Sequence, residues 1–175
     1  MGNKILLVGG FHEIIELAEN ESCVIVGIID KQGVGVYRDY SIISDDKNAV
    51  FLDPKFKSYP ILITPDEPIT RERLYEYYNS LGYHFTSLIS NKSIISKTAV
   101  VKNGSIIQTG VHVSAESVIG QFVKLNTNSN IMHNAIINDF TTIAPNAVIL
   151  GNVTIGKNCY IGANSTILPN ISICD

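Results

Sequence analysis

The chain has 175 residues, 45% of them hydrophobic, which is enough to bury the core of one ordinary domain or of two small ones. Thirteen basic against sixteen acidic residues give a formal charge of -3, and the basic residues form no cluster. This excludes an electrostatic case for nucleic-acid binding and favours a small-molecule partner.

Cysteine usage and the hydrophobic runs indicate the compartment. Cys23, Cys159 and Cys174 are odd in number and far apart, which suits reduced thiols better than a disulfide framework or a zinc site. No apolar run approaches the roughly 18 residues of a membrane span, and the first residues lead into a strand-like segment rather than a cleavable signal. We therefore expect a cytoplasmic protein with no metal site and no membrane partner.

Residues 4–82 alternate between strand and helix patterns. KILLVGG (4–10) and CVIVGIID (23–30) are β-branched runs, and the segment between them, 11–20, has helical spacing. YPILIT (59–64) predicts a further buried strand, and 65–82 a helix with Pro68 near its start and Gly82 at its end. A parallel α/β sheet follows from this order. Residues 34–58 are less regular and predict only a strand near AVFL (49–52).

After about residue 85 the period changes to six. Every sixth residue from Ile89 to Ile173 is aliphatic, and the residue two places before each is mostly small. Neither a helix nor a hairpin strand sustains this period, whereas a hexapeptide solenoid does, with three hexads closing one coil. The fold predicted is thus a parallel α/β domain over 1–86 and a β-helix of about five coils over 87–175.

A second column lies three residues after each aliphatic. From residue 128 it reads Asn at every position except Phe140: Asn128, Asn134, Asn146, Asn152, Asn158, Asn164 and Asn170. Asn tolerates a left-handed backbone better than any residue except Gly. The column therefore predicts the turns between flat faces.

His133 departs from the column that lies two residues after each aliphatic. This column should face outward at the corners, and His133 is its only histidine. A solvated surface side chain and a functional imidazole are both compatible with this position. Earlier in the chain, Gly9 and Gly10 follow the first strand, where a loop can bind an anion or simply form a tight turn.

The whole chain resembles the sugar O-/N-acyltransferases, typified by sialic-acid O-acetyltransferases and by N-acetyltransferases of nucleotide-linked 4-amino-sugars. The stretches that carry the resemblance are KILLVGGFHEIIELAE, VGIID, TRERLYEYYNSLG and, above all, residues 125–169. The resemblance implies a Rossmann-like domain followed by a left-handed β-helix, with acetyl-CoA as co-substrate and a nucleotide-linked amino-sugar as acceptor.

The resemblance also implies the roles of individual residues. His133 matches the catalytic base, Asn134 the residue that orients its ring, and Gly151 the backbone donor to the oxyanion. Contacts to coenzyme A would come from Thr142, Gly151 and Ala163. The nucleotide and sugar would be bound by Gly9, Gly10, Phe11, Asp30 and Lys31. An imidazole suits the base role because its pKa lies near neutral pH.

Three departures from the family pattern affect the expected activity. Asn134 replaces the acidic residue that usually follows the histidine, which removes a charge that would raise the pKa of the base. Thr142 replaces a second histidine found in some members. The chain ends at Asp175, roughly thirty residues earlier than is typical, so the coils that usually wall the pantetheine groove are expected to be missing.

Several alternatives stay open on the sequence. Transfer to a hydroxyl, as in sialic-acid O-acetylation, needs the same base as transfer to an amine. A catalytically weak paralogue that binds a nucleotide sugar is a second possibility, and a NAD-dependent oxidoreductase is disfavoured because the first loop lacks the full glycine fingerprint. The resemblance further implies a homotrimer, which a concentration-independent monomer in sedimentation would exclude.

Overall fold

The computed structural model describes residues 2–175, which form two compact units. The first unit runs to Pro65 and includes Arg73–Thr86, and the second comprises Asp66–Glu72 and Ser87–Asp175. The sequence predicted a single boundary after residue 86. The difference is the segment Asp66–Glu72, which clusters with the second unit.

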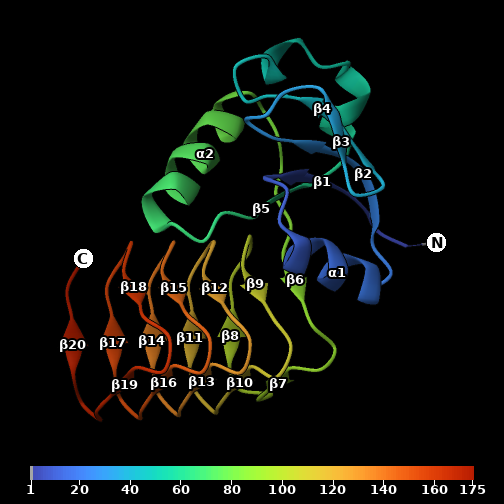
Figure 1. The fold of residues 1–175 in the computed structure, drawn as a ribbon. Helices are drawn as coiled ribbons and strands as arrows, with labels where there is room; N and C mark the ends of the chain where they lie inside the picture. The colour runs from blue at the N-terminus through green and yellow to red at the C-terminus, as the bar shows by residue number, and fades with distance from the viewer. Residues whose placement is uncertain (1) are drawn as a thin grey trace. The chain divides into compact units, whose positions relative to one another are not determined.

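The first unit is a five-stranded sheet with the order β3-β4-β2-β1-β5 (Figure 1). Strands β1 (Lys4–Val8), β2 (Val24–Ile29), β4 (Tyr40–Ser44) and β5 (Ile61–Ile63) are parallel, and β3 (Gly35–Tyr37) pairs antiparallel with β4. Helix α1 (His12–Asn20) buries Ile14, Ile15, Leu17 and Ala18. The predicted β1–α1–β2 unit and the strand β5 are confirmed.

Helix α2 (Pro68–Ser80) follows β5 and begins in the segment assigned to the second unit. Pro68 is its first residue, where a missing amide hydrogen costs nothing. Gly82 lies just beyond its end with φ of 80°, and its amide donates to Asn79 O. Both predicted boundaries of this helix are confirmed.

The predicted strand near 49–52 is wrong. Ala49–Phe51 is a 3-10 helix (η1), and a second one (η2) covers Pro54–Ser58. The Asp45 carboxylate accepts from the backbone and side-chain nitrogens of Asn48, which turns the chain just before this short apolar run. The strands of this region lie earlier, in the β3–β4 hairpin, which the sequence did not indicate.

The second unit winds through three parallel ladders of five two-residue strands each (Figure 1). The first ladder holds β6 (Leu88–Ile89), β9 (Ile106–Ile107), β12 (Lys124–Leu125), β15 (Thr142–Ile143) and β18 (Tyr160–Ile161). The second holds β7 (Ile94–Ile95), β10 (His112–Val113), β13 (Asn130–Ile131), β16 (Val148–Ile149) and β19 (Thr166–Ile167). The third holds β8 (Val100–Val101), β11 (Val118–Ile119), β14 (Ile136–Ile137), β17 (Thr154–Ile155) and β20 (Ser172–Ile173).

The six-residue aliphatic column forms the core of these coils. Its members from Ile107 to Ile155 are fully buried, and Ile161 is 7% exposed. Each fully buried Ile contributes about 1.5–3 kcal/mol, so the stacked column stabilises strands that are too short to persist alone. The hexapeptide repeat and the parallel ladders fit the predicted left-handed β-helix.

The corners also behave as the Asn column predicts. Every residue of this column from Gly104 to Asn170 has positive φ, between 53° at Phe122 and 80° at Gly104. The two aromatic members, Phe122 and Phe140, lie at the corner between the third and first ladders and stack with ring centroids 5.2 Å apart. Asn is therefore the usual residue at these turns. The presence of Phe at two successive positions of this corner must have a reason other than the turn conformation.

The segment Asp66–Glu72 packs at this corner, and its Arg71 is buried beside Phe122 and Phe140. Arg71 Nε donates to Phe122 O at 2.8 Å, and Nη2 donates to Phe140 O and to Thr142 Oγ1. Asp66 pairs with the buried Lys124 at 2.9 Å and accepts from Asn126. Phe122 and Phe140 lie on successive coils, so a single guanidinium that donates to both of their carbonyls joins two coils to this segment.

The Asp66–Lys124 pair predicts acid-sensitive stability. Burial alone would raise the pKa of Asp66, but Lys124 and Asn126 hold it below its ordinary value of 3.8. A carboxyl with a lowered folded pKa stabilises the fold above its unfolded pKa, and this contribution is lost as pH falls through the folded pKa. We expect Asp66→Asn to lower the free energy of unfolding by about 1–2 kcal/mol near neutral pH.

Denaturant titrations from about pH 7 down to about pH 3 would check this expectation. The gap between wild type and Asp66→Asn should narrow only below about pH 4. A gap that stays constant to the lowest pH would show that Asp66 does not contribute through its charge.

Candidate active site

His133 lies at the corner that follows the second ladder. The backbone there is tied to both neighbouring coils, because Asn134 N donates to Ala115 O at 3.0 Å and His133 O accepts from Asn152 N at 3.1 Å. Asn134 has φ of 60°, as the turn column predicts. The imidazole is exposed while its backbone is fixed, so a reactive side chain is held on a rigid support.

The ring of His133 is oriented by its neighbour. Nδ1 lies 3.0 Å from Asn134 Oδ1. An amide oxygen can only accept, so this hydrogen bond requires the proton on Nδ1 and leaves Nε2 with a free lone pair. The arrangement selects the tautomer in which Nε2 can act as a base.

Gly151 lies one coil further along the same corner and is in contact with the His133 ring. A Cβ built on Gly151 would lie 2.5 Å from His133 Cε1 and 2.6 Å from Nε2. Such distances are too short for any real side chain, so glycine is required for the ring to lie where it does. His133, Asn134 and Gly151 are therefore one local cluster.

The amide of Gly151 donates to no acceptor within residues 2–175, although the residue is buried. Among the described residues, some amides of this column are paired and others are not: Gln121 N donates to Asp139 Oδ1 at 2.8 Å and Lys157 N to Asp175 Oδ1 at 2.6 Å, whereas the amides of Ala115 and His133 at the same corner as Gly151 have no acceptor. In both paired cases the acceptor comes from the equivalent position of the next coil. Above Gly151 that position is Pro169, which has no polar side chain, so the donor stays available.

The two further residues predicted to contact coenzyme A lie elsewhere on the coils. Ala163 is exposed at the corner after the first ladder. Thr142 lies within that ladder, is fully buried, and its hydroxyl donates to Asp66 O and accepts from Arg71 Nη2. The structure thus brings together three of the predicted catalytic and cofactor residues and leaves Thr142 and Ala163 apart from them.

The predicted nucleotide loop lies in the first unit and is internally bonded. Gly9 has φ of 97°, and its amide donates to Ile29 O at 2.8 Å. Gly10 N donates to Asp30 Oδ2 at 2.9 Å, which brings two of the predicted residues together. The Tyr37 ring lies over Gly10 and stacks on His12, while Phe11 is 36% exposed. The contacts predicted between this loop and a nucleotide stay a prediction.

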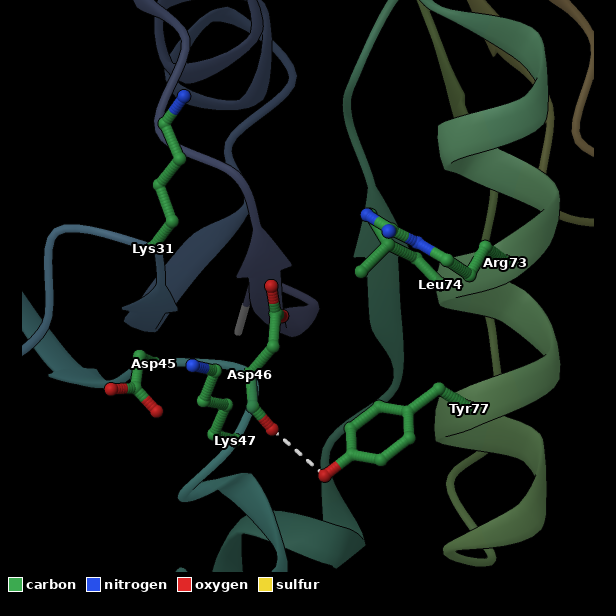
Figure 2. A pocket seen from close by; sticks show the side chains of 7 residues that line it. All are labelled: Lys31, Asp45, Asp46, Lys47, Arg73, Leu74 and Tyr77. Atoms are coloured by element: carbon green, nitrogen blue, oxygen red, sulfur yellow. Dashed lines mark hydrogen bonds between the residues drawn. The ribbon is translucent and has the colours of Figure 1, made fainter.

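A cavity of about 440 Å³ opens in the first unit and was not predicted (Figure 2). Its lining residues come from three segments: Lys31, Asp45, Asp46, Lys47, Arg73, Leu74 and Tyr77. Arg73 and Tyr77 project from α2 toward the segment that carries the two aspartates (Figure 2). Lys31 was predicted as a substrate contact, but nothing in the sequence pattern linked it to the others.

Within residues 2–175, no group of three or more His, Cys, Asp or Glu side chains is arranged to hold a metal ion. None of the helices in the same range combines the length and the apolar character that a bilayer crossing needs.

Comparison with protein families matches residues 116–151 and 135–169 to the family described as bacterial transferase hexapeptide (six repeats). No curated protein sequence matches the chain. The predicted resemblance to hexapeptide-repeat acyltransferases is thereby supported in the repeat region itself.

Solved structures extend the similarity to the whole fold. A histidine-to-asparagine variant of perosamine N-acetyltransferase from Caulobacter crescentus, with CoA and GDP-perosamine, has a TM-score of 0.91 and 17% identity, covering 99% of this chain and 83% of that one. The acetyltransferase domain of PglB from Neisseria gonorrhoeae, with acetyl coenzyme A, has a TM-score of 0.86 and 21% identity, covering 100% and 86%. WeeI from Acinetobacter baumannii has a TM-score of 0.72 and 17% identity, covering 98% and 94%.

Proposed function

We propose that this chain, which carries the bacterial transferase hexapeptide repeat and shares the fold of nucleotide-sugar acetyltransferases, is an acetyl-CoA-dependent N-acetyltransferase acting on a nucleotide-linked amino-sugar. The observation that carries the proposal is the contact between His133 and Gly151. An imidazole with a free Nε2 lone pair lies beside an amide that has no acceptor within the described residues, which supports the roles of base for His133 and oxyanion donor for Gly151.

The His133 imidazole and the Gly151 amide suit two steps of acyl transfer: removal of a proton from the amine and stabilisation of the oxyanion. Nε2 of His133 accepts a proton from the sugar amine as its nitrogen attacks the thioester carbonyl, and the amide of Gly151 donates to the resulting oxyanion. The tetrahedral intermediate then collapses, the C–S bond breaks, and the proton on His133 passes to the departing thiolate. General-base catalysis contributes about 10²–10⁴ in rate, and one oxyanion donor about 10²–10³.

Similar structures support the choice of substrates. One was solved with CoA and GDP-perosamine and another with acetyl coenzyme A, and two were solved as variants of a single histidine. For this chain we propose that the nucleotide-linked sugar is bound by the first unit, near Gly9, Gly10, Phe11, Asp30 and Lys31. The coenzyme would run along the β-helix past Ala163, whereas Thr142 offers it no exposed surface.

A homotrimer is part of the proposal. The third ladder presents Val100, 51% exposed, and Ile136, 40% exposed, on its outer face, and His133 lies at the edge of that face. An apolar face of this kind is expected to be covered by another copy of the chain.

The direct test is acetyl transfer from acetyl-CoA to nucleotide-linked 4-amino-sugars, followed by release of the free thiol. The product should gain one acetyl group in an amide, which resists hydroxylamine, whereas an ester on a sugar hydroxyl is cleaved by it. Thiol release that does not depend on any amino-sugar would contradict the proposal, and an ester product would favour the O-acetyltransferase alternative.

Gly151→Ala should reduce acetyl transfer severely. The added Cβ would overlap the His133 ring, which must then turn away from the free amide. We expect kcat to fall by about 10²-fold or more with the fold retained. Ala115→Gly, a change between the same two residue types at the same corner two coils earlier, is the matched control for steady-state kinetics and circular dichroism. An active Gly151→Ala variant would show that the ring contact is not needed.

A further inference from the structure

The sheet of the first unit ends at a strand that is open to pairing. Strand β3 is the outermost strand in the order β3-β4-β2-β1-β5, and no other described strand pairs with its outer side (Figure 1). Natural edge strands commonly carry a lysine, a proline or a β-bulge that prevents pairing with another chain. Residues 34–37 read VGVY, and the pairing of β3 with β4 has no register shift. This edge therefore has none of these three protections.

The backbone of Val36 points toward the open side. Tyr37 pairs with Tyr40 across the two-residue turn Arg38–Asp39. The pair that closes such a turn is hydrogen-bonded, and hydrogen-bonded and non-hydrogen-bonded pairs alternate along an antiparallel ladder. Val36, which lies opposite Ser41, is the next residue along β3, so its amide and carbonyl point away from β4. One donor and one acceptor are thus available to another strand.

The side chains around this edge are apolar and exposed. Val34 is 84% exposed, Val36 72% and Phe51 82%. Val34 and Phe51 also line a hollow of about 270 Å³, together with Ile43 and Leu52. Large apolar side chains that gather on one part of a surface mark an interaction site.

The charges near these side chains favour a second copy of the chain over a lipid surface. The segment 45–57, which carries Phe51, has three aspartates and three lysines. Asp53 and Lys55 pair with each other at 3.1 Å. An anionic bilayer attracts a surplus of basic residues, which this segment lacks. Two copies of a surface with balanced charges do not repel each other, and a twofold contact needs only one self-complementary surface.

We propose that β3 pairs antiparallel with β3 of a second copy of the chain, with Val36 opposite Val36 of the second copy. In this register the two Val36 residues exchange two backbone hydrogen bonds, and their side chains lie on the same face of the joined sheet. Gly35 then lies opposite Tyr37 of the second copy. The contact uses residues of the first unit only, so it is separate from the homotrimer proposed through the third ladder.

The test is the molar mass of the full chain, measured by light scattering over a range of concentrations. We expect Val36→Lys and Val36→Glu, each alone, to have at most half the mass of wild type, because like charges would lie directly opposite each other. A mixture of the two variants should regain the wild-type mass, because Lys then faces Glu.

Val24→Lys is the matched control, since Val24 is a 45% exposed valine at the start of β2, a strand inside the sheet. It should keep the wild-type mass. Circular dichroism should be the same for all three variants, because each replaced side chain is exposed.

Three results would overturn the proposal: a wild-type chain no heavier than the two Val36 variants, a Val24→Lys variant that loses as much mass as they do, or a mixture that stays at the lower mass. The comparison between wild type and variants holds whether or not the second unit forms a trimer. It also needs no substrate, so its outcome is independent of the proposed function.

Discussion

His133→Ala should lower kcat for acetyl transfer by about 10²–10⁴-fold while the Kd for nucleoside diphosphates stays unchanged. The variant removes the Nε2 lone pair but leaves the backbone hydrogen bonds of the corner, which involve His133 O and Asn134 N. Steady-state kinetics would measure the loss, and titration without acetyl-CoA would measure the unchanged binding.

His112→Ala is the control for this experiment. His112 lies in β10, one coil earlier than β13, and faces outward from a strand rather than from a corner. Its replacement should change turnover by less than a few-fold. If His133→Ala retained wild-type turnover, His133 would not be the base. A wild-type chain that bound nucleotide without any turnover would favour the alternative of a catalytically weak paralogue that binds a nucleotide sugar.

Arg71→Ala should lower the free energy of unfolding by about 3–5 kcal/mol. The Arg71 side chain is 1% exposed and donates to Phe122 O, Phe140 O and Asp66 O, so its loss removes these buried hydrogen bonds and leaves a void. Burial lowers the pKa of Arg71 to about 10, against the opposing effect of Asp66 and Glu67, so it stays charged at neutral pH. Chemical denaturation followed by circular dichroism would measure the change.

Arg73→Ala provides the matched control, because the same substitution is made two residues later in the same helix at an exposed position. It should change stability by no more than about 0.5 kcal/mol. Arg71→Lys should fall between the two, since an ammonium cannot reach all of these acceptors at once. Equal effects of the two alanine variants would show that the buried hydrogen bonds contribute little.

The β-helix could be predicted from the sequence because its repeat determines both the core and the corners. The aliphatic at every sixth position is buried from Ile107 to Ile155, and each corner residue after it takes a left-handed backbone. The Phe122–Phe140 pair could not be explained from the repeat, because its partner Arg71 lies 51 residues before Phe122 in the chain. Local periodicity carries no information about such a contact.

In the first unit, the pattern of apolar residues in the sequence predicted only part of the secondary structure. Strands with long β-branched runs, such as β1 and β2, were predicted, but the short AVFL run is a 3-10 helix because turn-forming Asp45 and Asn48 precede it. The strands of the β3–β4 hairpin are short, three and five residues, and were not predicted. The cavity was missed for a different reason: its charged residues come from three separate segments, and only the folded sheet brings them together.

The candidate catalytic cluster was within reach of the sequence because of the repeat. His133 and Gly151 occupy the same position in successive coils, so any fold that keeps the repeat must stack them. The sequence could not predict the hydrogen bond between the His133 ring and Asn134 or the lack of an acceptor for the Gly151 amide, because both depend on side-chain positions in the folded coils. Pro169, at the equivalent position of the next coil, offers that amide no side-chain acceptor, and no motif would have indicated this.

The in-register stacking of the coils limits how this protein can change in length. Asn130 pairs with Val148 and Val148 with Thr166, so the chain returns to the same ladder every eighteen residues. An insertion within a strand that is not a multiple of six would move every later side chain onto the wrong column and expose the aliphatics. An insertion of six or twelve residues between His133 and Gly151 would keep the aliphatics buried but would place these two residues on different corners. Evolutionary growth or shortening between them is therefore restricted to whole coils or to loops that leave and re-enter at a corner.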